Sequence, residues 1–310
     1  MITTVTLNAT MDKTCFVGDL RIGMVNRVPD MRCFPGGKGI NAARVAHDLG
    51  CPVLTTGFVA GFNGSFIETE LSRRGLLHDF ARIDGESRVS LNIIDRFTGK
   101  TTEILERGPQ IGADDVLAIR DKVRSAVTSS SVLAICGSMP EGTPVNLYAD
   151  FIEMAHQEGI VSILDASGEA LLAGIEARPT CVKPNEDELE AVLGKKPEQD
   201  EDVYEAVQRL LDKGISCVAA TLGERGAVVG MDGRLFRVIV PALEAVNVVG
   251  CGDAFVGAMC AGYYRRMPEE EIIRMAAATA AASALTEEAG NVNLNDMRAL
   301  LGEIRIDPLS

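Results

Sequence analysis

The sequence predicts an α/β fold in which helices cover both faces of a mostly parallel central sheet. Three observations support this prediction. The chain begins with a β-branched run, Ile2–Leu7, that is typical of a buried strand. From residue 113 onward, apolar runs alternate with segments of helical spacing. The composition, 46% hydrophobic and 24% charged, is sufficient for a large core. Such alternation requires right-handed crossovers, which place successive strands in parallel.

The N-terminal part contains two predicted helices. Gly39–Leu49 has apolar residues at helical spacing and ends before Gly50, a common stop signal. A strand over Val53–Val59 and a helix over Phe66–Gly75 follow.

The later elements alternate regularly, and ligands of such sheets bind at the carboxyl ends of the strands. The predicted helices are Ala113–Val127, Val145–Glu158, Glu186–Leu193 and Val203–Lys213. The predicted strands are Val132–Cys136, Ile160–Asp165, Thr180–Lys183 and Cys217–Thr221. A β-rich segment ends near Val240, and a helix rich in small residues follows over Val256–Tyr264.

Two strand-like segments, at about 14–34 and 87–107, do not follow this alternation. Their runs are short and antiparallel in character, and Thr98-Gly99 is a hairpin signal between Val89–Asp95 and Lys100–Leu105. We expect them to form a small sheet over the carboxyl edge of the central sheet. That sheet is a lid that excludes water, an oligomer interface, or both, because an exposed sheet needs its other face covered. Residues 1–310 are therefore predicted to form one domain with a lid.

Composition disfavours several classes of protein. The formal net charge of −14 argues against nucleic-acid and anionic-membrane surfaces, although it allows a small anionic ligand. No apolar run approaches membrane-spanning length, and no secretory signal is recognisable. The eight cysteines form no C-x-x-C pair, so we expect reduced thiols in a cytoplasmic protein. His47, His78 and His156 lie in helical or polar segments, which disfavours a histidine triad or metal centre.

A glycine-rich turn opens the helix near the C-terminus. Gly250 and Gly252 flank Cys251, and glycines at such a place present bare amide groups. The helix N-terminus adds partial positive charge, so the turn is suited to an anion. Asp253 in the first turn has two interpretations. It caps the helix, or it is a general base beside the anion hole.

A second glycine-rich entry to a helix is GGKGIN, residues 36–41. It is neither a Walker loop nor the dinucleotide fingerprint, because Lys38 is followed by glycine and the glycine spacing differs. Gly36 and Gly37 can bring the backbone close to a polyol, while Asn41 offers a donor and an acceptor to hydroxyls. Asp12, just past the first strand, can grip vicinal hydroxyls. The competing interpretations are a tight turn with a cap and an ordinary turn aspartate.

Two further motifs follow predicted strands. Thr221, Gly223 and Gly226 in TLGERG can cradle nucleotide phosphates, although turns of this composition are common. Asn185 and Glu188 in KPNEDE stand three apart at a helix start, where they can hold a magnesium-bound water. A capping box with an acidic first turn fits equally well.

Arg27 and Arg88 lie in the two lid segments. Each is more often a solvated side chain than a ligand. Two arginines aimed at a cleft are, however, what a substrate phosphate requires.

GGKGIN at 36–41 and GCGDAF at 250–255, in a chain of this length, resemble the PfkB (ribokinase-like) carbohydrate kinases. The resemblance covers essentially the whole chain, because further motifs occur in the expected order. They are TLNATMD (6–12), VNR (25–27), EILERGP (103–109), GSMPEG (137–142), DASG (165–168) and KPNE (183–186). The motifs are most similar to the branch with 1-phosphofructokinase and tagatose-6-phosphate kinase.

The resemblance implies a ribokinase-like core with a β-sheet lid, often shared across a homodimer, and transfer of the ATP γ-phosphate to a sugar hydroxyl. It also implies roles for individual residues. Asp253 is the implied base, and the amides of Gly250, Cys251 and Gly252 the anion hole. The implied sugar site is Asp12, Gly36, Gly37, Lys38, Asn41 and Ser138, with Arg27 and Arg88 near the sugar's phosphate. The implied nucleotide site is Lys183, Asn185, Thr221, Gly223 and Gly226, with Mg²⁺ at Asn185 and Glu188 through water. A monovalent cation such as K⁺ is implied at carbonyls near Asn247, Val249 and Gly290.

One departure bears on the substrate. Asn247 stands where the family signature usually has Asp, and sugar-phosphate kinases of the family are more permissive there. The leading hypothesis is therefore an ATP-dependent kinase of fructose 1-phosphate, tagatose 6-phosphate or fructose 6-phosphate that forms the bisphosphate. The alternatives are a family kinase of an unphosphorylated sugar or nucleoside and a non-catalytic sugar-phosphate sensor. A nicotinamide oxidoreductase is disfavoured, because no G-x-G-x-x-G follows the first strand.

Overall fold

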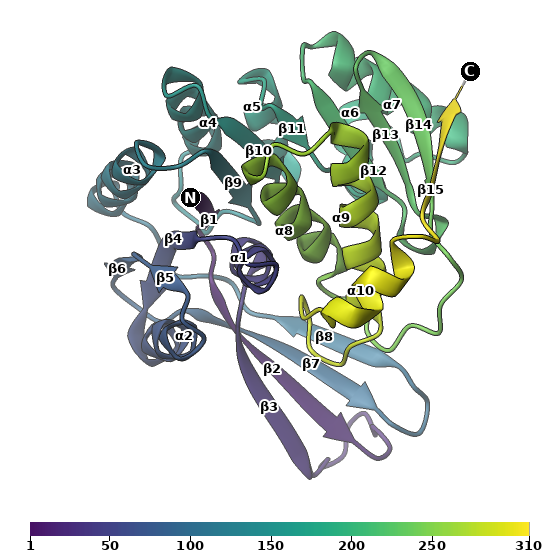
Figure 1. The fold of residues 1–310 in the computed structure, drawn as a ribbon. Coiled ribbons are helices and arrows are strands. Elements are labelled where there is room, and N and C mark those ends of the chain that lie inside the picture. Colours follow the sequence, from purple (N-terminus) through teal and green to yellow (C-terminus); the bar gives the residue numbers. More distant parts are fainter. Residues whose placement is uncertain (310) are drawn as a thin grey trace.

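An eleven-stranded sheet forms the centre of the computed structural model, which describes residues 1–309 (Figure 1). The neighbouring strands β12, β11, β10, β9, β1, β4 and β5 pair in parallel, whereas β12, β13, β14 and β15 form an antiparallel extension. The prediction of a mostly parallel sheet is therefore confirmed. In order across the sheet, the strands are β15 (Arg305–Leu309), β14 (Arg234–Ile239), β13 (Ala227–Met231), β12 (Cys217–Thr221), β11 (Cys181–Val182), β10 (Val161–Asp165), β9 (Val132–Cys136), β1 (Ile2–Thr6), β4 (Val53–Ala60) and β5 (Leu77–His78), with β6 (Ala81–Ile83) also on β4.

Helices cover both faces of this sheet, as predicted. Successive residues of β9 show why, because Val132, Ala134 and Cys136 enter one core while Leu133 and Ile135 enter the other. One face carries α1 (Lys38–Asp48), α2 (Gly61–Arg73), α8 (Cys251–Tyr264), α9 (Glu269–Ala284) and α10 (Leu294–Leu300). The other face carries α3 (Ala113–Val127), α4 (Leu147–Gln157), α5 (Gly168–Glu176), α6 (Glu186–Leu193) and α7 (Asp200–Asp212).

The second sheet has four strands in the order β3-β2-β7-β8 and projects from one end of the molecule (Figure 1). Its strands are β2 (Thr10–Val17), β3 (Asp30–Gly36), β7 (Arg88–Asp95) and β8 (Thr101–Leu105). The expected small sheet is therefore present, with two corrections. Residues 18–29 contain no strand, and the central pair β2–β7 is parallel rather than antiparallel. It is parallel because β2 and β7 both leave the same edge of the central sheet, after β1 and β6 respectively.

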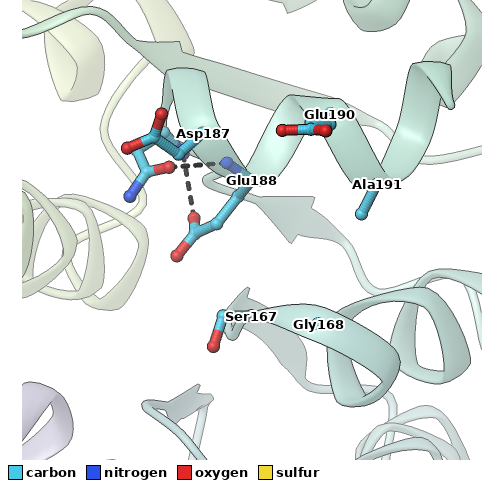
Figure 2. Close-up of a pocket in the computed structure, with 7 residues that line it drawn as sticks. Ser167, Gly168, Asp187, Glu188, Glu190 and Ala191 are labelled. Carbon is cyan, nitrogen blue, oxygen red and sulfur yellow. Dashed lines mark hydrogen bonds between the residues drawn. The ribbon is translucent and has the colours of Figure 1, made fainter. Parts of the chain in front are cut away.

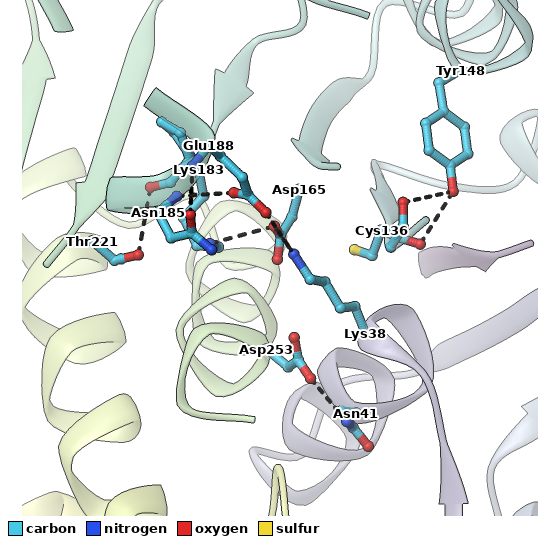
Figure 3. A network of polar contacts seen from close by, with 12 residues as sticks. Lys38, Asn41, Cys136, Tyr148, Asp165, Lys183, Asn185, Glu188, Thr221 and Asp253 are labelled. Carbon is cyan, nitrogen blue, oxygen red and sulfur yellow. Dashed lines mark hydrogen bonds and ion pairs between the residues drawn. The ribbon is translucent and has the colours of Figure 1, made fainter. Parts of the chain in front are cut away.

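The carboxyl ends of the parallel strands gather the polar residues that the sequence singled out. Ser138 follows β9, Asp165 ends β10, Lys183 follows β11 and Thr221 ends β12. The N-terminus of α8, with Asp253, faces the same region (Figure 3). This edge is where ligands of open α/β sheets bind.

Several elements were not predicted from the sequence, namely α5, α9, α10 and the strands β5, β6 and β15, and α2 begins five residues before its predicted start. The β-rich segment that was expected to end near Val240 consists of β13 and β14. All eight cysteines, which lie within the described part of the chain, are free. No helix within residues 1–309 is both long enough and apolar enough to cross a membrane.

Candidate active site

Asp253 is held in the first turn of α8 by a turn that only glycine can form. Gly250 precedes the helix with φ of 83°, and a Cβ there would lie 2.4 Å from the Gly290 nitrogen. Asp253 is 8% exposed, and its Oδ2 accepts a hydrogen bond of 2.8 Å from Asn41 Nδ2 on α1 (Figure 3). No backbone N–H within residues 1–309 donates to this carboxylate, so the structure gives no support to a capping role.

The environment of Asp253 shifts its protonation. Burial raises the pKa of Asp253 to about 6, and the nearby Asp165 carboxylate contributes to the rise. Lys38, the amide of Asn41 and Lys183 oppose it. A carboxyl with this pKa is ionised at neutral pH yet remains a stronger base than an exposed aspartate.

Two lysines flank a buried carboxylate beside Asp253 (Figure 3). Lys38 Nζ lies 2.9 Å from Asp165 Oδ1 and 3.1 Å from Glu188 Oε1, while Lys183 Nζ lies 3.4 Å from the same Asp165 oxygen. Burial by itself would lower the pKa of Lys38, but the two carboxylates raise it above its ordinary value. Burial would raise the pKa of Asp165, yet the two ammonium groups lower it. Lys38 and Asp165 therefore both favour their charged forms.

Asp12 on β2 and Arg88 on β7 bring the small sheet to the site. A Cβ at Gly36 would lie 2.0 Å from Asp12 Oδ2, so the first glycine of GGKGIN makes room for this carboxylate. Burial raises the pKa of Asp12 to about 7, Arg88 opposes the rise, and Asp253 adds to it. The Asp12 carboxyl therefore interacts with both the Arg88 guanidinium and the Asp253 carboxylate. Arg88 Nε donates to the Asn8 carbonyl at 3.1 Å, and burial lowers the pKa of its guanidinium.

The glycine turn at α8 leaves backbone donors available. The Cys251 amide makes only a long bond of 3.4 Å to the Val248 carbonyl, and within residues 1–309 the amides of Gly250 and Gly252 have no acceptor. A Cβ at Gly252 would stand 3.6 Å from Lys183 Nζ, so an ammonium group lies close to these amides. Free amides and a cation at a helix N-terminus favour an anion.

The KPNEDE motif forms the capping box that was one of its two interpretations. Asn185 Oδ1 accepts from the Glu188 amide at 2.7 Å, and Glu188 Oε2 accepts from the Asn185 amide at 2.9 Å. The other Glu188 oxygen faces Lys38. A pocket of about 480 Å³ lies against this helix start (Figure 2). It is lined by Ser167, Gly168, Asn185, Asp187, Glu188, Glu190 and Ala191.

The TLGERG turn lies next to KPNEDE in space, because Thr221 bridges to Asn185. Gly223 and Gly226 have φ of 60° and 78°. A Cβ at Gly226 would lie 2.1 Å from the Val238 carbonyl oxygen. Packing against β14 therefore already explains Gly226, whatever the turn binds.

The loops that hold Asn247 and Gly290 run side by side. Asn247 Nδ2 donates to the Glu287 carbonyl at 3.0 Å, and its Oδ1 accepts from the Val249 amide at 3.0 Å. Gly250 packs directly on Gly290. The segments expected to supply carbonyls to a monovalent cation are thus adjacent.

Two of the predicted site residues, Arg27 and Ser138, are exposed. Arg27 is exposed in segment 18–29, and no contact within residues 1–309 brings it to Arg88. Ser138 is exposed at the site's edge, where its Oγ accepts from Asn8 Nδ2 at 3.2 Å.

Sequence reasoning assigned no role to two charged residues at the site. Asp165 ends a parallel strand, a position that could have identified it. Arg44 interrupts the apolar face of α1 and is 2% exposed. A charge among Ala43, Val45 and Ala46 was the available signal.

Comparisons with known proteins agree with this geometry. A model of the pfkB family of carbohydrate kinases matches residues 4–296. Phosphofructokinase-2 from Escherichia coli, in a complex with potassium, is 25% identical, with a TM-score of 0.91 over 97% of this chain and 98% of that one. A protein provisionally named phosphofructokinase from Staphylococcus aureus is 29% identical, with a TM-score of 0.82 over 100% and 99%. A protein provisionally named 1-phosphofructokinase from Thermotoga maritima shares the fold, with a TM-score of 0.92 over both full chains at 23% identity.

Proposed function

Because the chain belongs to the pfkB family of carbohydrate kinases, we propose that it transfers the γ-phosphate of ATP to a hydroxyl of a hexose monophosphate. Fructose 1-phosphate, tagatose 6-phosphate and fructose 6-phosphate are the proposed acceptors. The observation that carries the proposal is Asp253, buried and hydrogen-bonded to Asn41 beside unpaired amides and two lysines. Similarity to phosphofructokinase-2 at 25% identity, and to a protein provisionally named phosphofructokinase at 29% identity, supports a phosphorylated sugar.

The proposed mechanism assigns one task to each group. Asp253 accepts the proton of the attacking sugar hydroxyl, which is a poor nucleophile without proton removal. The amides of Gly250, Cys251 and Gly252, with Lys183 beside them, stabilise negative charge on the transferred phosphoryl group. Little covalent chemistry is required of the protein, so positioning and charge neutralisation dominate.

We assign the sugar to the space between the lid and α1. Asp12 and Asn41 offer acceptors and donors to its hydroxyls. Arg88 makes one hydrogen bond through Nε, and within residues 1–309 its two Nη atoms have no partner. These free donors suit a phosphate group on the sugar. Arg27 remains a proposed second phosphate ligand that would require movement of segment 18–29.

The nucleotide and Mg²⁺ are proposed to bind at the ends of β10 to β12, with the nucleotide against Lys183, Asn185, Thr221, Gly223 and Gly226. No cluster of three or more His, Cys, Asp or Glu that could hold a metal exists within residues 1–309. A few oxygen ligands nevertheless fit Mg²⁺, which binds mainly to phosphates and water. The buried Asp165 Oδ2 has no partner in the described structure, so a carboxylate oxygen is available near Glu188. When bound, Mg²⁺ would neutralise charge on the ATP phosphates.

Two further features of the proposal concern K⁺ and the assembly. The adjacent carbonyl-bearing loops at Asn247, Val249 and Gly290 fit a monovalent cation such as K⁺. A homodimer through the lid is supported by β8, which is exposed along its whole length and carries Ile104 and Leu105 at 52% and 59% exposure. Sedimentation equilibrium would measure the assembly directly.

An ADP-release assay across a panel of sugars tests the activity. We expect ATP-dependent ADP formation with at least one of the three hexose monophosphates and a much smaller kcat/KM with fructose, tagatose and ribose. Preference for an unphosphorylated sugar or a nucleoside would redirect the proposal to that substrate class. Binding of sugar phosphate without any turnover would identify a sensor instead.

We expect activity to fall at acidic pH because Asp253 becomes protonated. The base must be ionised, and its pKa is raised to about 6, so kcat/KM for ATP at saturating sugar should be level above about pH 7. Below pH 6 it should fall about tenfold per pH unit. Saturating sugar keeps Asp12 covered, so its own ionisation does not enter. A profile that stays level down to pH 5 would be incompatible with this base.

A further inference from the structure

We propose that Arg44 is a positioning residue for phosphoryl transfer, which fixes the Asn41 side-chain amide with its nitrogen toward Asp253. The inference rests on the proposed role of Asp253 as the base. Arg44 lies on α1 one turn after Asn41, and it touches neither Asp253 nor the open part of the site.

The guanidinium is held between α1 and the loop that follows α9. Arg44 Nη1 lies 3.4 Å from Asn41 Oδ1 and 3.5 Å from the Ala289 carbonyl oxygen. Its Nη2 forms an ion pair with Glu288. Backbone of the same loop packs on Asn41, because a Cβ at Gly290 would lie 2.8 Å from Asn41 Cβ. Arg44 and this loop therefore both pack against the Asn41 side chain.

This arrangement fixes which end of the amide faces the base. A guanidinium has only donors, so the oxygen of Asn41 must face Arg44. The Asn41 nitrogen is then left pointing at Asp253 Oδ2, at 2.8 Å. A flipped amide would place oxygen against the carboxylate and nitrogen against the guanidinium, which is unfavourable at both ends. Without Arg44, only the Asp253 carboxylate holds the amide in this orientation, and no donor fixes the amide oxygen on the opposite side.

A purely structural role explains Arg44 less well. Taking a guanidinium out of water is costly, and apolar residues fill the neighbouring core positions of α1 at no such cost. Burial lowers the pKa of Arg44, and its Nε has no partner within residues 1–309. The rival functional explanation is a direct charge effect, because Arg44 also lowers the pKa of Asp12.

A double-mutant cycle on kcat separates these explanations. Arg44→Met should lower kcat roughly tenfold at saturating ATP and sugar, with KM for ATP unchanged. On an Asn41→Ala background, the same change should lower kcat less than about twofold, because the amide through which Arg44 acts is gone. A full tenfold loss on both backgrounds would overturn the inference in favour of a charge or stability effect.

Two companion variants complete the test. Arg74→Met is the matched control, since Arg74 Nη2 also donates to Glu288, at 2.8 Å, but does not contact Asn41. It should retain normal kcat, and a tenfold loss would make the loop rather than Asn41 responsible. Arg44→Lys keeps a charged donor and should recover part of the loss; it replaces Arg44→Met in the cycle if the latter does not fold. Wild-type protein inactive on the whole panel would remove the proposed function itself, whereas an active wild type with additive effects removes only the inference about Arg44.

Discussion

Asp253→Asn is expected to lower kcat by roughly three to four orders of magnitude, because the amide cannot accept the hydroxyl proton. The substitution is nearly isosteric, and its side-chain oxygen can still accept the hydrogen bond from Asn41. KM for ATP and sugar should therefore change little. Steady-state measurement of ADP release with the best sugar from the panel gives both parameters.

The same variant should be more stable than the wild type at alkaline pH. The pKa of Asp253 in the folded protein, about 6, lies above its ordinary value of 3.8, so folding favours the protonated form. Ionised Asp253 therefore destabilises the fold above pH 6, and this penalty disappears as the pH falls below about 4. We expect a gain in unfolding free energy of order 1–3 kcal/mol at pH 8, and none at pH 4.

An exposed carboxylate provides the control for the stability measurement. The side chain of Asp187 on α6 is 85% exposed, so Asp187→Asn should leave stability unaffected. Near-normal turnover of Asp253→Asn would remove Asp253 from the chemistry. A lower melting temperature at pH 8 would show that the buried charge is not a cost in the folded protein.

The location of the site could be predicted from the sequence, because it follows from chain order. Motifs directly after strands or at helix starts must gather at one edge of a parallel sheet. Asn41 and Asp253, 212 positions apart, meet for this reason. The identity of ion-pair partners does not follow from chain order. Lys38 was predicted to hold the sugar, yet the structure places its Nζ between Asp165 and Glu188. This pairing depends on the directions of the three side chains, which local sequence patterns do not encode.

The unpredicted elements have physical explanations of a different kind. Helix α9 is rich in alanine and buried on most sides, so it lacks the polar face that makes a helix recognisable in sequence. The parallel pairing of β2 with β7 depends on where both strands leave the central sheet, which only the tertiary structure defines. Within residues 14–34, strand-like stretches surround a loop, and local composition did not separate the two.

Arg88→Met is expected to raise KM for a hexose monophosphate about 100-fold, with little effect on KM for the corresponding unphosphorylated hexose. The physical reason is the pair of Arg88 Nη atoms, which have no partner within residues 1–309, on a half-buried side chain whose pKa is lowered by burial. Arg82→Met is a suitable control, because Arg82 is a more exposed arginine on β6 that pairs with Glu68. That variant should leave both KM values unchanged.

The ratio of the two KM values decides the outcome, rather than either value alone. Loss of Arg88 also removes a cation that lowers the pKa of Asp12, so hydroxyl recognition by Asp12 weakens as well. That second effect is common to both sugars, since each presents the hydroxyls that Asp12 is proposed to contact, and it cancels in the ratio. A change confined to the phosphorylated sugar therefore reports a direct contact between Arg88 and the phosphate. Equal weakening of both sugars would mean that Arg88 acts only through Asp12 or through its bond to the Asn8 carbonyl, and the assignment of a sugar phosphate to this site would then fail.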